Sequence, residues 1–170
     1  IGMDEMILRE ASDEKIKNYA ADIKSSGKTL LNIINDILDF SKIEAGKMQI
    51  IPSQYDLSSF CNDIVNMIAK RASDKNLKLN INIDSKSPNS LFGDETRVKQ
   101  CVLNLLTNAV KYTHEGSVSL DILSTKIGDA KVKLRFTVSD TGIGIKQEDI
   151  AKLVTPFERV EEARNRTIEG

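Results

Sequence analysis

The chain has 170 residues, a length for one domain or one and a half, with 40% hydrophobic residues, 29% charged residues and a net charge of −1. This balance excludes the large basic field expected of a nucleic-acid-binding protein, and no apolar run approaches the roughly 18 residues of a membrane span. No signal peptide opens the sequence. Both cysteines, Cys61 and Cys101, fall on apolar positions of predicted helices. They favour buried free thiols in a reducing compartment over a disulfide framework.

The N-terminal part of the chain is predicted to be helical in two pieces. A short helix runs from about Met3 to Glu10, and a heptad pattern follows over residues 13–46, with Ser12 and Asp13 as candidate N-caps and Gly46 ending the helix. The two seam positions of the heptad hold Ile16, Ile23, Leu30 and Ile37, and Ala20, Gly27, Ile34 and Ser41. Further apolar residues widen this stripe beyond a two-stranded seam. The pattern predicts a helical hairpin or dimeric bundle, although one amphipathic helix on a single core is the alternative.

The rest of the chain alternates between strand and helix patterns. Residues 77–83, 117–123 and 131–138 alternate apolar and polar side chains, which predicts strands with one wet face, and "KIGD" at 126–129 joins the last two as a hairpin. Two helices belong with them, the second over about residues 94–113. Their apolar stripes are Leu57, Phe60, Cys61, Ile64, Val65 and Ile68, and Val98, Cys101, Val102, Leu105, Leu106 and Ala109. The pattern predicts a two-layer α+β sandwich after the helical segment.

The second of these helices also carries a polar stripe. Arg97 and Gln100 are best interpreted as part of a solvated face. Asn104 and Asn108 stand among apolar neighbours, and two amide oxygens one turn apart suit Mg²⁺ that shares its ligands with substrate phosphates. Lys111 would then supply a positive charge for the same phosphates. Spacing alone does not separate this metal site from a solvated surface.

The apolar face of the third strand ends in a carboxylate. Asp140 has the same parity as the apolar residues before it, so it must be solvated, paired or hydrogen-bonded to a ligand. "DTGIGI" follows at 140–145, and Gly142 and Gly144 allow a sharp turn and a close approach of the backbone to a ligand. Taken alone, this is either a functional loop or an ordinary turn.

Together these segments resemble the sensor histidine kinases of two-component systems. "NLLTNAVKYT" (104–113) resembles their N box, "DTGIGI" (140–145) their first glycine box and "TPFERVEEA" (155–163) their F box. "GDETRVKQCVLNLL" (93–106) resembles the usual run into the N box. "LLNIINDILDFSKIEAGKM" (30–48) resembles the end of the second helix of their dimerisation and phosphoacceptor domain. Several motifs in the right order make the resemblance specific.

The resemblance implies two domains and a signalling function. Residues 1–47 would be a dimerisation and phosphoacceptor segment that lacks the phosphoacceptor histidine. Residues 48–170 would be a catalytic ATP-binding domain of the Bergerat type that lacks the second glycine box and the final strands. The intact homodimeric parent would transfer the γ-phosphoryl group of ATP to a histidine and then to an aspartate on a response-regulator receiver domain. The chain would be a cytoplasmic portion, inactive alone in autophosphorylation, of a parent that is either soluble or membrane-anchored.

The same resemblance implies roles for individual residues, with ATP and Mg²⁺ as cofactors. Asn104 and Asn108 would approach the Mg²⁺–phosphate assembly as metal ligands, and Lys111 would contact phosphate. Tyr112 would stack near the adenine, and Asp140 would accept a hydrogen bond from the adenine amine. For Tyr112, a place in the core is the structural alternative.

Further residues would form the pocket wall and a mobile lid. Gly142 and Gly144 would shape the wall, and Phe157 would belong to the lid unless it only packs a helix end. Residues 155–170 are therefore expected to be poorly ordered or displaced without nucleotide, and the sheet is expected to leave an exposed edge. His114, the single histidine, is expected in an exposed turn and not as the phosphoacceptor.

Two alternative functions stay open. The same nucleotide fold serves hydrolytic ATPases such as DNA gyrase and mismatch-repair proteins, which typically carry a glutamate at the position of Asn104. Asparagine cannot act as a general base, which favours phosphoryl transfer over hydrolysis. A noncatalytic dimerisation module with a degenerate nucleotide fold is the third hypothesis, and the joint presence of Asn104, Asn108, Lys111 and Asp140 argues against it.

Overall fold

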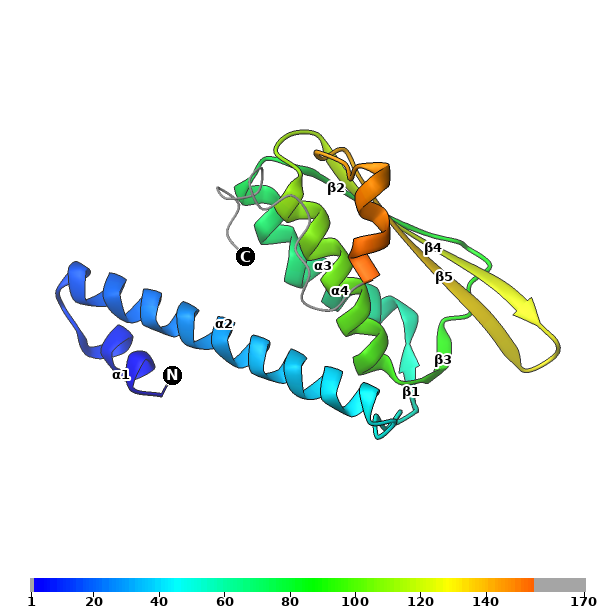
Figure 1. Ribbon diagram of the computed structural model, residues 1–170, viewed down its shortest axis with the longest axis horizontal. Helices are drawn as coiled ribbons and strands as arrows, with labels where there is room; N and C mark the ends of the chain where they lie inside the picture. The colour runs from blue at the N-terminus through cyan, green and yellow to red at the C-terminus, as the bar shows by residue number, and fades with distance from the viewer. Residues whose placement is uncertain (1, 155–170) are drawn as a thin grey trace. The chain divides into compact units, whose positions relative to one another are not determined.

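The chain folds into two compact units, residues 1–50 and 51–170. Their structure is a computed structural model that describes residues 2–154 (Figure 1). Among the described residues, the regular secondary structure of the first unit is helical, whereas the second unit contains both helices and strands.

The first unit consists of a short and a long helix, α1 (Gly2–Glu10) and α2 (Glu14–Glu44), as predicted. Asp13 is the N-cap of α2, and its Oδ1 accepts a hydrogen bond from the backbone N–H of Lys15 at 2.7 Å. The helix stops at its C-cap just before Gly46, which has the left-handed φ of +63° that favours glycine. The local signals of capping and termination therefore set both ends of α2.

The two helices of the first unit pack on each other but cover little of the heptad stripe. An ion pair of 2.9 Å joins Lys24 Nζ of α2 to Glu5 Oε1 of α1, and Ala20 is the one residue of α2 that is buried. The large seam side chains stay exposed at 45–59%: Ile16, Ile23, Leu30 and Ile37. Over residues 2–154, no helix combines the length and apolar character needed to cross a membrane.

Within residues 51–154, the second unit contains two α-helices, five strands and a 3₁₀ helix. In chain order these are β1 (Ser53–Asp56), α3 (Leu57–Asp74), β2 (Lys78–Ile83), β3 (Ser90–Gly93), α4 (Glu95–Tyr112), β4 (Ser117–Ile127), β5 (Lys131–Asp140) and η1 (Gln147–Val154). The three predicted strands and both predicted helices are confirmed. The short strands β1 and β3, which pair antiparallel with each other, were not predicted.

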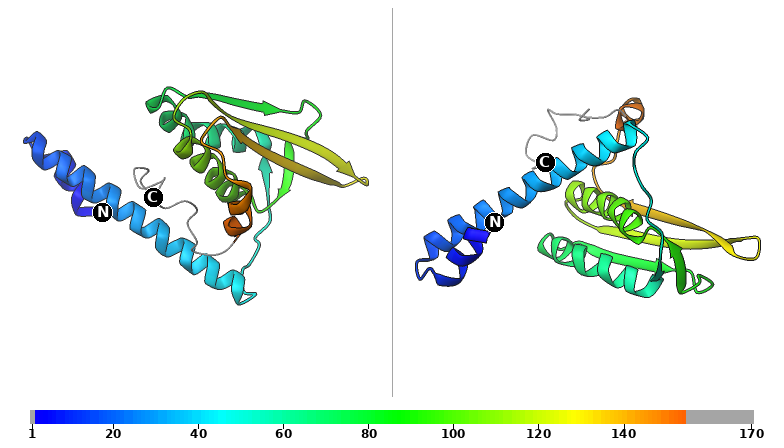
Figure 2. Two further views of the ribbon diagram at one scale, coloured as in Figure 1. Left: turned by 45° about the horizontal axis from the view of Figure 1, so that its top comes forward. Right: turned by 90° about the horizontal axis from the view of Figure 1, so that it is seen from below.

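A three-stranded sheet in the order β2–β4–β5 forms one layer of this unit, with β2 parallel and β5 antiparallel to β4. Helices α3 and α4 lie side by side on one face of the sheet (Figures 1 and 2). Residues with no exposed surface line the interface: Phe60, Ile64, Ile68, Leu106, Val118, Leu120 and Ile122. The predicted two-layer α+β sandwich is confirmed.

One part of the predicted core is wrong. Cys101 is exposed and Leu105 is 52% exposed, although both were assigned to the apolar stripe of α4. The buried residues of α4 are Val102, Leu106, Ala109 and Val110. At 100° per residue, Cys101 and Leu105 fall on the flank of this arc, beyond the reach of α3 and the sheet. Cys61 is buried as predicted, and this burial raises the pKa of its thiol.

Candidate functional site

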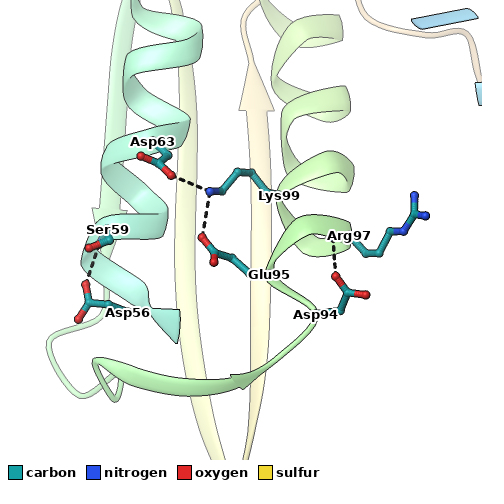
Figure 3. A network of polar contacts seen from close by, with 7 residues as sticks. All are labelled: Asp56, Ser59, Asp63, Asp94, Glu95, Arg97 and Lys99. Carbon is teal, nitrogen blue, oxygen red and sulfur yellow. Dashed lines mark hydrogen bonds and ion pairs between the residues drawn. The ribbon is translucent and has the colours of Figure 1, made fainter. Parts of the chain in front are cut away.

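The N-terminal end of α4 is fixed by a single carboxylate. Asp94 is the N-cap, and one of its oxygens accepts a hydrogen bond from the backbone N–H of Arg97 at 3.0 Å (Figure 3). Its other oxygen accepts a hydrogen bond from the backbone N–H of Ile51 at 2.8 Å. The hydrogen bond from Ile51, followed in size of effect by that from Arg97, holds the pKa of Asp94 below its ordinary value. The ionised cap thereby joins the chain before β1 to the first turn of α4.

An ion-pair network holds α4 against α3. Lys99 Nζ lies 2.7 Å from Asp63 Oδ2 on α3 and 2.9 Å from Glu95 Oε1 on its own helix (Figure 3). The same ammonium lies 5.8 Å from the ring centroid of Phe60. The bond to Asp63, followed by that to Glu95, raises the pKa of Lys99. Together with the buried stripe, these contacts set the position of the helix that carries most of the candidate site residues.

Asn104 and Asn108 lie on the exposed side of α4, one turn apart. Within residues 2–154 neither side-chain amide takes part in a hydrogen bond. Two such oxygens fit Mg²⁺ chemically, because this ion prefers hard oxygen ligands, retains several waters and shares phosphate oxygens with the protein. Among the described residues, no cluster of three or more His, Cys, Asp or Glu side chains offers another metal site.

The last turn of α4 carries the next two candidates, Lys111 and Tyr112, which are both half-buried. Lys111 Nζ lies 5.3 Å from the ring centroid of Tyr112, within cation–π distance. The carbonyl of Tyr112 accepts a hydrogen bond from the N–H of Ile143 at 3.2 Å. The end of α4 is thus bonded directly to the glycine turn that follows β5.

Asp140 is the last residue of β5 and is exposed. Its Oδ1 accepts a hydrogen bond from the N–H of Gly142 at 2.8 Å. Its other oxygen has no partner within residues 2–154. The carboxylate is therefore oriented by its own turn and keeps one acceptor for a ligand donor.

Gly142 lies where the end of α4 and the end of β5 come closest. A Cβ atom at this position would lie 2.5 Å from the carbonyl oxygen of Tyr112, 2.7 Å from Asp140 Oδ1 and 2.9 Å from Thr113 Oγ1. Only glycine allows this approach without a displacement of backbone. Thr113 is fully buried, and sequence reasoning missed it although it ends the N-box segment.

The base of the turn is held by a second hydroxyl. Thr141 Oγ1 accepts from the N–H of Ser117 at 3.0 Å and donates to the carbonyl of Glu115 at 3.1 Å. Gly144 follows with a left-handed φ of +65° and is exposed. This threonine was also not singled out from the sequence, because its role depends on a strand that lies 24 residues earlier.

The structure therefore brings four of the predicted residues together and aligns two more with them. Lys111, Tyr112, Asp140 and Gly142 meet at the end of α4, whereas Asn104 and Asn108 lie one to two turns earlier on the same helix.

Three further expectations concern other parts of the chain. His114 lies exposed in the bend after α4, as predicted. Phe157 and the expectation of poor order over residues 155–170 lie outside the described residues.

Comparison with known families assigns both units. A sequence model described as "His Kinase A (phospho-acceptor) domain" matches residues 1–46. A second, described as "Histidine kinase-, DNA gyrase B-, and HSP90-like ATPase", matches residues 93–170. The chain belongs to the histidine kinase family. The matched residues of this kinase chain include α2 in the first unit and α4 and β5 in the second.

Curated relatives of the kinase chain agree with this assignment. It is 41% identical to the non-motile and phage-resistance protein of Caulobacter vibrioides, over 99% of the chain and 20% of the relative. It is 33% identical to the signal transduction histidine-protein kinase BarA of Escherichia coli, over 98% of the chain and 18% of the relative. Hybrid signal transduction histidine kinase L of Dictyostelium discoideum is 39% identical over 95% of the chain and 9% of its own length. The chain thus spans a fifth or less of these relatives.

Solved structures of kinases share the fold. Full-length ShkA in complex with AMPPNP superimposes with a TM-score of 0.69 and 28% identity, over 89% of this chain and 32% of that one. Histidine kinase AdeS of Acinetobacter baumannii gives a TM-score of 0.63 over 89% of this chain and 75% of its own, and its 17% identity shows the fold alone.

Proposed function

We propose that the parent of this kinase chain binds Mg²⁺-ATP at the junction of α4 and β5. The observation that carries the proposal is the meeting of Tyr112, Asp140 and Gly142 at the end of the helix that presents Asn104 and Asn108. A purine site, a phosphate site and a metal site would then lie along one helix. The similarity to ShkA, which was crystallised with AMPPNP, supports a nucleotide as the ligand.

Each residue has a role that its surroundings support. The free oxygen of Asp140 accepts a hydrogen bond from the adenine amine, and the ring of Tyr112 stacks near the base. Lys111 contacts phosphate as a point charge.

The remaining candidates complete the pocket. The amide oxygens of Asn104 and Asn108 share Mg²⁺ with the phosphate oxygens, and the ion, when bound, neutralises charge that develops on the phosphoryl group. Gly142 and Gly144 shape the pocket wall. Phe157 belongs to a lid in this proposal and lies outside the described residues.

The proposed reaction is phosphoryl transfer to a histidine and then to an aspartate of a response-regulator receiver domain. His114 is unsuited as the acceptor, because it lies at the end of α4 in the nucleotide-binding unit and not on the phosphoacceptor helices. The parent supplies the acceptor imidazole, and residues 1–47 and 48–170 act as dimerisation segment and ATP-binding domain. ThkA, a kinase solved with the response regulator TrrA, shares the fold at a TM-score of 0.56 and 22% identity, over 99% of this chain and 48% of that one.

The proposal extends to assembly and location. The exposed heptad stripe of α2 favours a homodimer in which two copies bury their seams against each other. The free thiols favour a cytoplasmic location for this portion of the parent.

A hydrolytic ATPase is the second candidate, because the family that matches residues 93–170 also includes gyrase-like and HSP90-like ATPases. Asn104 argues against it, since an amide cannot remove a proton from water. Measuring ATP turnover by the parent without any phosphate acceptor separates the two functions: steady phosphate release would favour the ATPase.

Nucleotide titration of the full-length parent tests the binding proposal. Asp140→Ala is expected to weaken ATP binding by at least roughly tenfold, because the purine amine loses a charged acceptor. Asp129→Ala is the matched control, since Asp129 is an exposed aspartate in the hairpin turn before β5, at the opposite end of that strand from Asp140, and has no hydrogen bond in the described residues. Equal affinities of wild type and Asp140→Ala would instead favour a noncatalytic module.

A further inference from the structure

The C-terminal end of α4 has a partner for each of its last four carbonyl groups. An α-helix leaves these four acceptors without intrahelical bonds, so they must be satisfied from outside the ladder. The first of them, on Ala109, accepts a hydrogen bond from Thr113 Oγ1 at 2.7 Å. The last, on Tyr112, accepts from the N–H of Ile143 at 3.2 Å. The two carbonyls between them require a third donor.

That donor is the ammonium group of Lys75, which comes from the loop after α3. Its Nζ donates to the carbonyl of Val110 at 2.9 Å and to that of Lys111 at 2.8 Å. A third, longer bond of 3.4 Å reaches the carbonyl of Thr113. All three protons of the ammonium therefore have acceptors on the end of α4.

The backbone beneath Lys75 is itself fixed. The N–H of Asn76 bonds to the carbonyl of Ser73 and that of Leu77 to the carbonyl of Ala72, both at 2.9 Å. Asn76 has a left-handed φ of 56°, and both Leu77 and Ala72 are buried in the core. These features define a Schellman motif, in which the residue after the helix turns the chain back. Lys75 thus projects from a defined position and not from a loose loop.

The turn that Lys75 holds is the same turn that forms the candidate site. It carries Lys111 and Tyr112, and the Tyr112 carbonyl lies against Gly142 at the point where no Cβ could fit. A helix C-terminus also presents partial negative charge, which disfavours a nearby triphosphate. An ammonium bonded to these carbonyls offsets that charge while it fixes their positions.

We propose that Lys75 is a positioning residue for nucleotide binding, holding the last turn of α4 in the geometry that the purine and phosphates require. This inference rests on the proposed function of the same site. Lys75 touches the backbone of the site and acts on nucleotide through Lys111, Tyr112 and the glycine turn. Preorganisation of this kind changes ligand affinity even where the fold is kept.

The test is ATP titration of the full-length parent in Mg²⁺, well below the unfolding temperature of each variant. Lys75→Met, which keeps most of the stem and removes the donors, is expected to raise the Kd for ATP by roughly tenfold. Lys75→Arg keeps charge and donors and is expected to stay within about threefold of wild type. Lys70→Met is the matched control, because Lys70 is an exposed lysine on α3 without a hydrogen bond in the described residues, and its Kd should not change.

Amide hydrogen exchange distinguishes a local effect at the end of α4 from a general loss of stability, which would raise exchange rates throughout the unit. In Lys75→Met the N–H of Ile143 should exchange faster, while amides in the centre of β4 keep their wild-type rates. If Lys75→Met fails to fold, Lys75→Gln takes its place, with an expected rise in Kd of about threefold because one neutral donor remains.

The outcomes separate this inference from the function on which it rests. If wild type binds ATP and Lys75→Met, or Lys75→Gln in its place, binds it equally well, the positioning role is wrong and the nucleotide site stands. If wild type itself does not bind ATP, both are wrong. Selective weakening with rescue by arginine supports both.

Discussion

The two units of the chain differ in where they bury their apolar side chains. In residues 51–170, Phe60 and Leu106 have no exposed surface, because α3, α4 and the sheet enclose them. In residues 1–50, the seam residues Ile23 and Leu30 are 58% and 59% exposed, and Ala20 is the one buried residue of α2. The second unit contains its own core, whereas the first displays an exposed apolar stripe.

This difference shows that the two hydrophobic patterns encode different kinds of contact. The apolar residues of α4 pack within one chain, whereas we propose that the heptad of α2 packs against further helices. A helix obtains most of its stability from the packing of its apolar face, so the stability of the first unit should depend on association and therefore on protein concentration.

The largest effect is expected from charges in the seam. Ile23→Asp combined with Leu30→Asp would place two unpaired carboxylates from each protomer in the proposed dimer interface, at a cost of more than roughly 5 kcal/mol. Sedimentation of the full-length parent should change from dimer to monomer, with an unchanged Kd for ATP. Lys28→Asp, on an exposed position of α2, should leave the dimer intact. A dimer that survives the double substitution would contradict the assignment of the stripe.

A matched pair of leucines tests the core of the second unit. Leu106→Ala is expected to lower the free energy of unfolding by about 2–5 kcal/mol, because it opens a cavity at a fully buried position. Its neighbour Leu105 is half exposed, so Leu105→Ala should cost less than about 1 kcal/mol. Urea unfolding measures both. Equal losses would show that the two residues are equally enclosed and that the correction to the predicted stripe is mistaken.

Gly142→Ala tests the close approach at the site. The new Cβ would meet the Tyr112 carbonyl at 2.5 Å, so either the turn or the end of α4 must move. A displacement of that size is expected to weaken ATP binding by roughly 100-fold. Gly93→Ala is the control, because its Cβ would have only an ordinary contact of 3.7 Å with the Tyr55 ring. Unchanged nucleotide affinity in Gly142→Ala would remove this turn from the site.

The smallest effect concerns the response to acid. The backbone N–H groups of Ile51 and Arg97 lower the pKa of Asp94 in the folded state, so its contribution to stability is present above the unfolded pKa of about 3.9. This contribution is lost as the pH falls below that value through the folded pKa. In Asp94→Asn the free energy of unfolding should therefore fall less steeply with decreasing pH, below the unfolded pKa of about 3.9.

The control for this prediction is Asp129→Asn, at an exposed hairpin position without a hydrogen bond in the described residues. Its unfolding free energy should depend on pH as that of wild type does. If the unfolding free energy of Asp94→Asn depended on acid pH as that of wild type does, the hydrogen bonds of the cap would not form in solution. Both variants are compared by urea unfolding at a series of pH values.

Long periodic elements were predictable from sequence because their pattern is local. The expected helix over 94–113 is α4, Glu95–Tyr112, and the three alternating segments are β2, β4 and β5. The strands β1 and β3 were missed, since four residues are too few to show alternation and "SLFG" has turn character. The sequence also could not predict that Cys101 is exposed, because its exposure depends on how far the neighbouring elements extend around the helix.

The site residues that belong to short sequence motifs could be predicted, whereas those defined by tertiary contacts could not. Asp140 and Gly142 were found from a carboxylate at a strand end and a glycine turn, and both lie at the junction with α4. Thr113, Thr141 and Lys75 were not found, because their contacts are tertiary or lack a local signature. Lys75, for example, reaches carbonyls 35–38 residues away in the sequence.

The central claim is that one pocket, built from the end of α4 and the end of β5, holds the nucleotide. Amide chemical shifts of the parent measured by NMR during addition of Mg²⁺-ATP test it most directly. The account predicts that residues 104–113 and 140–144 shift together, with one common Kd. Shifts confined to one of these segments, or centred on other residues, would contradict it.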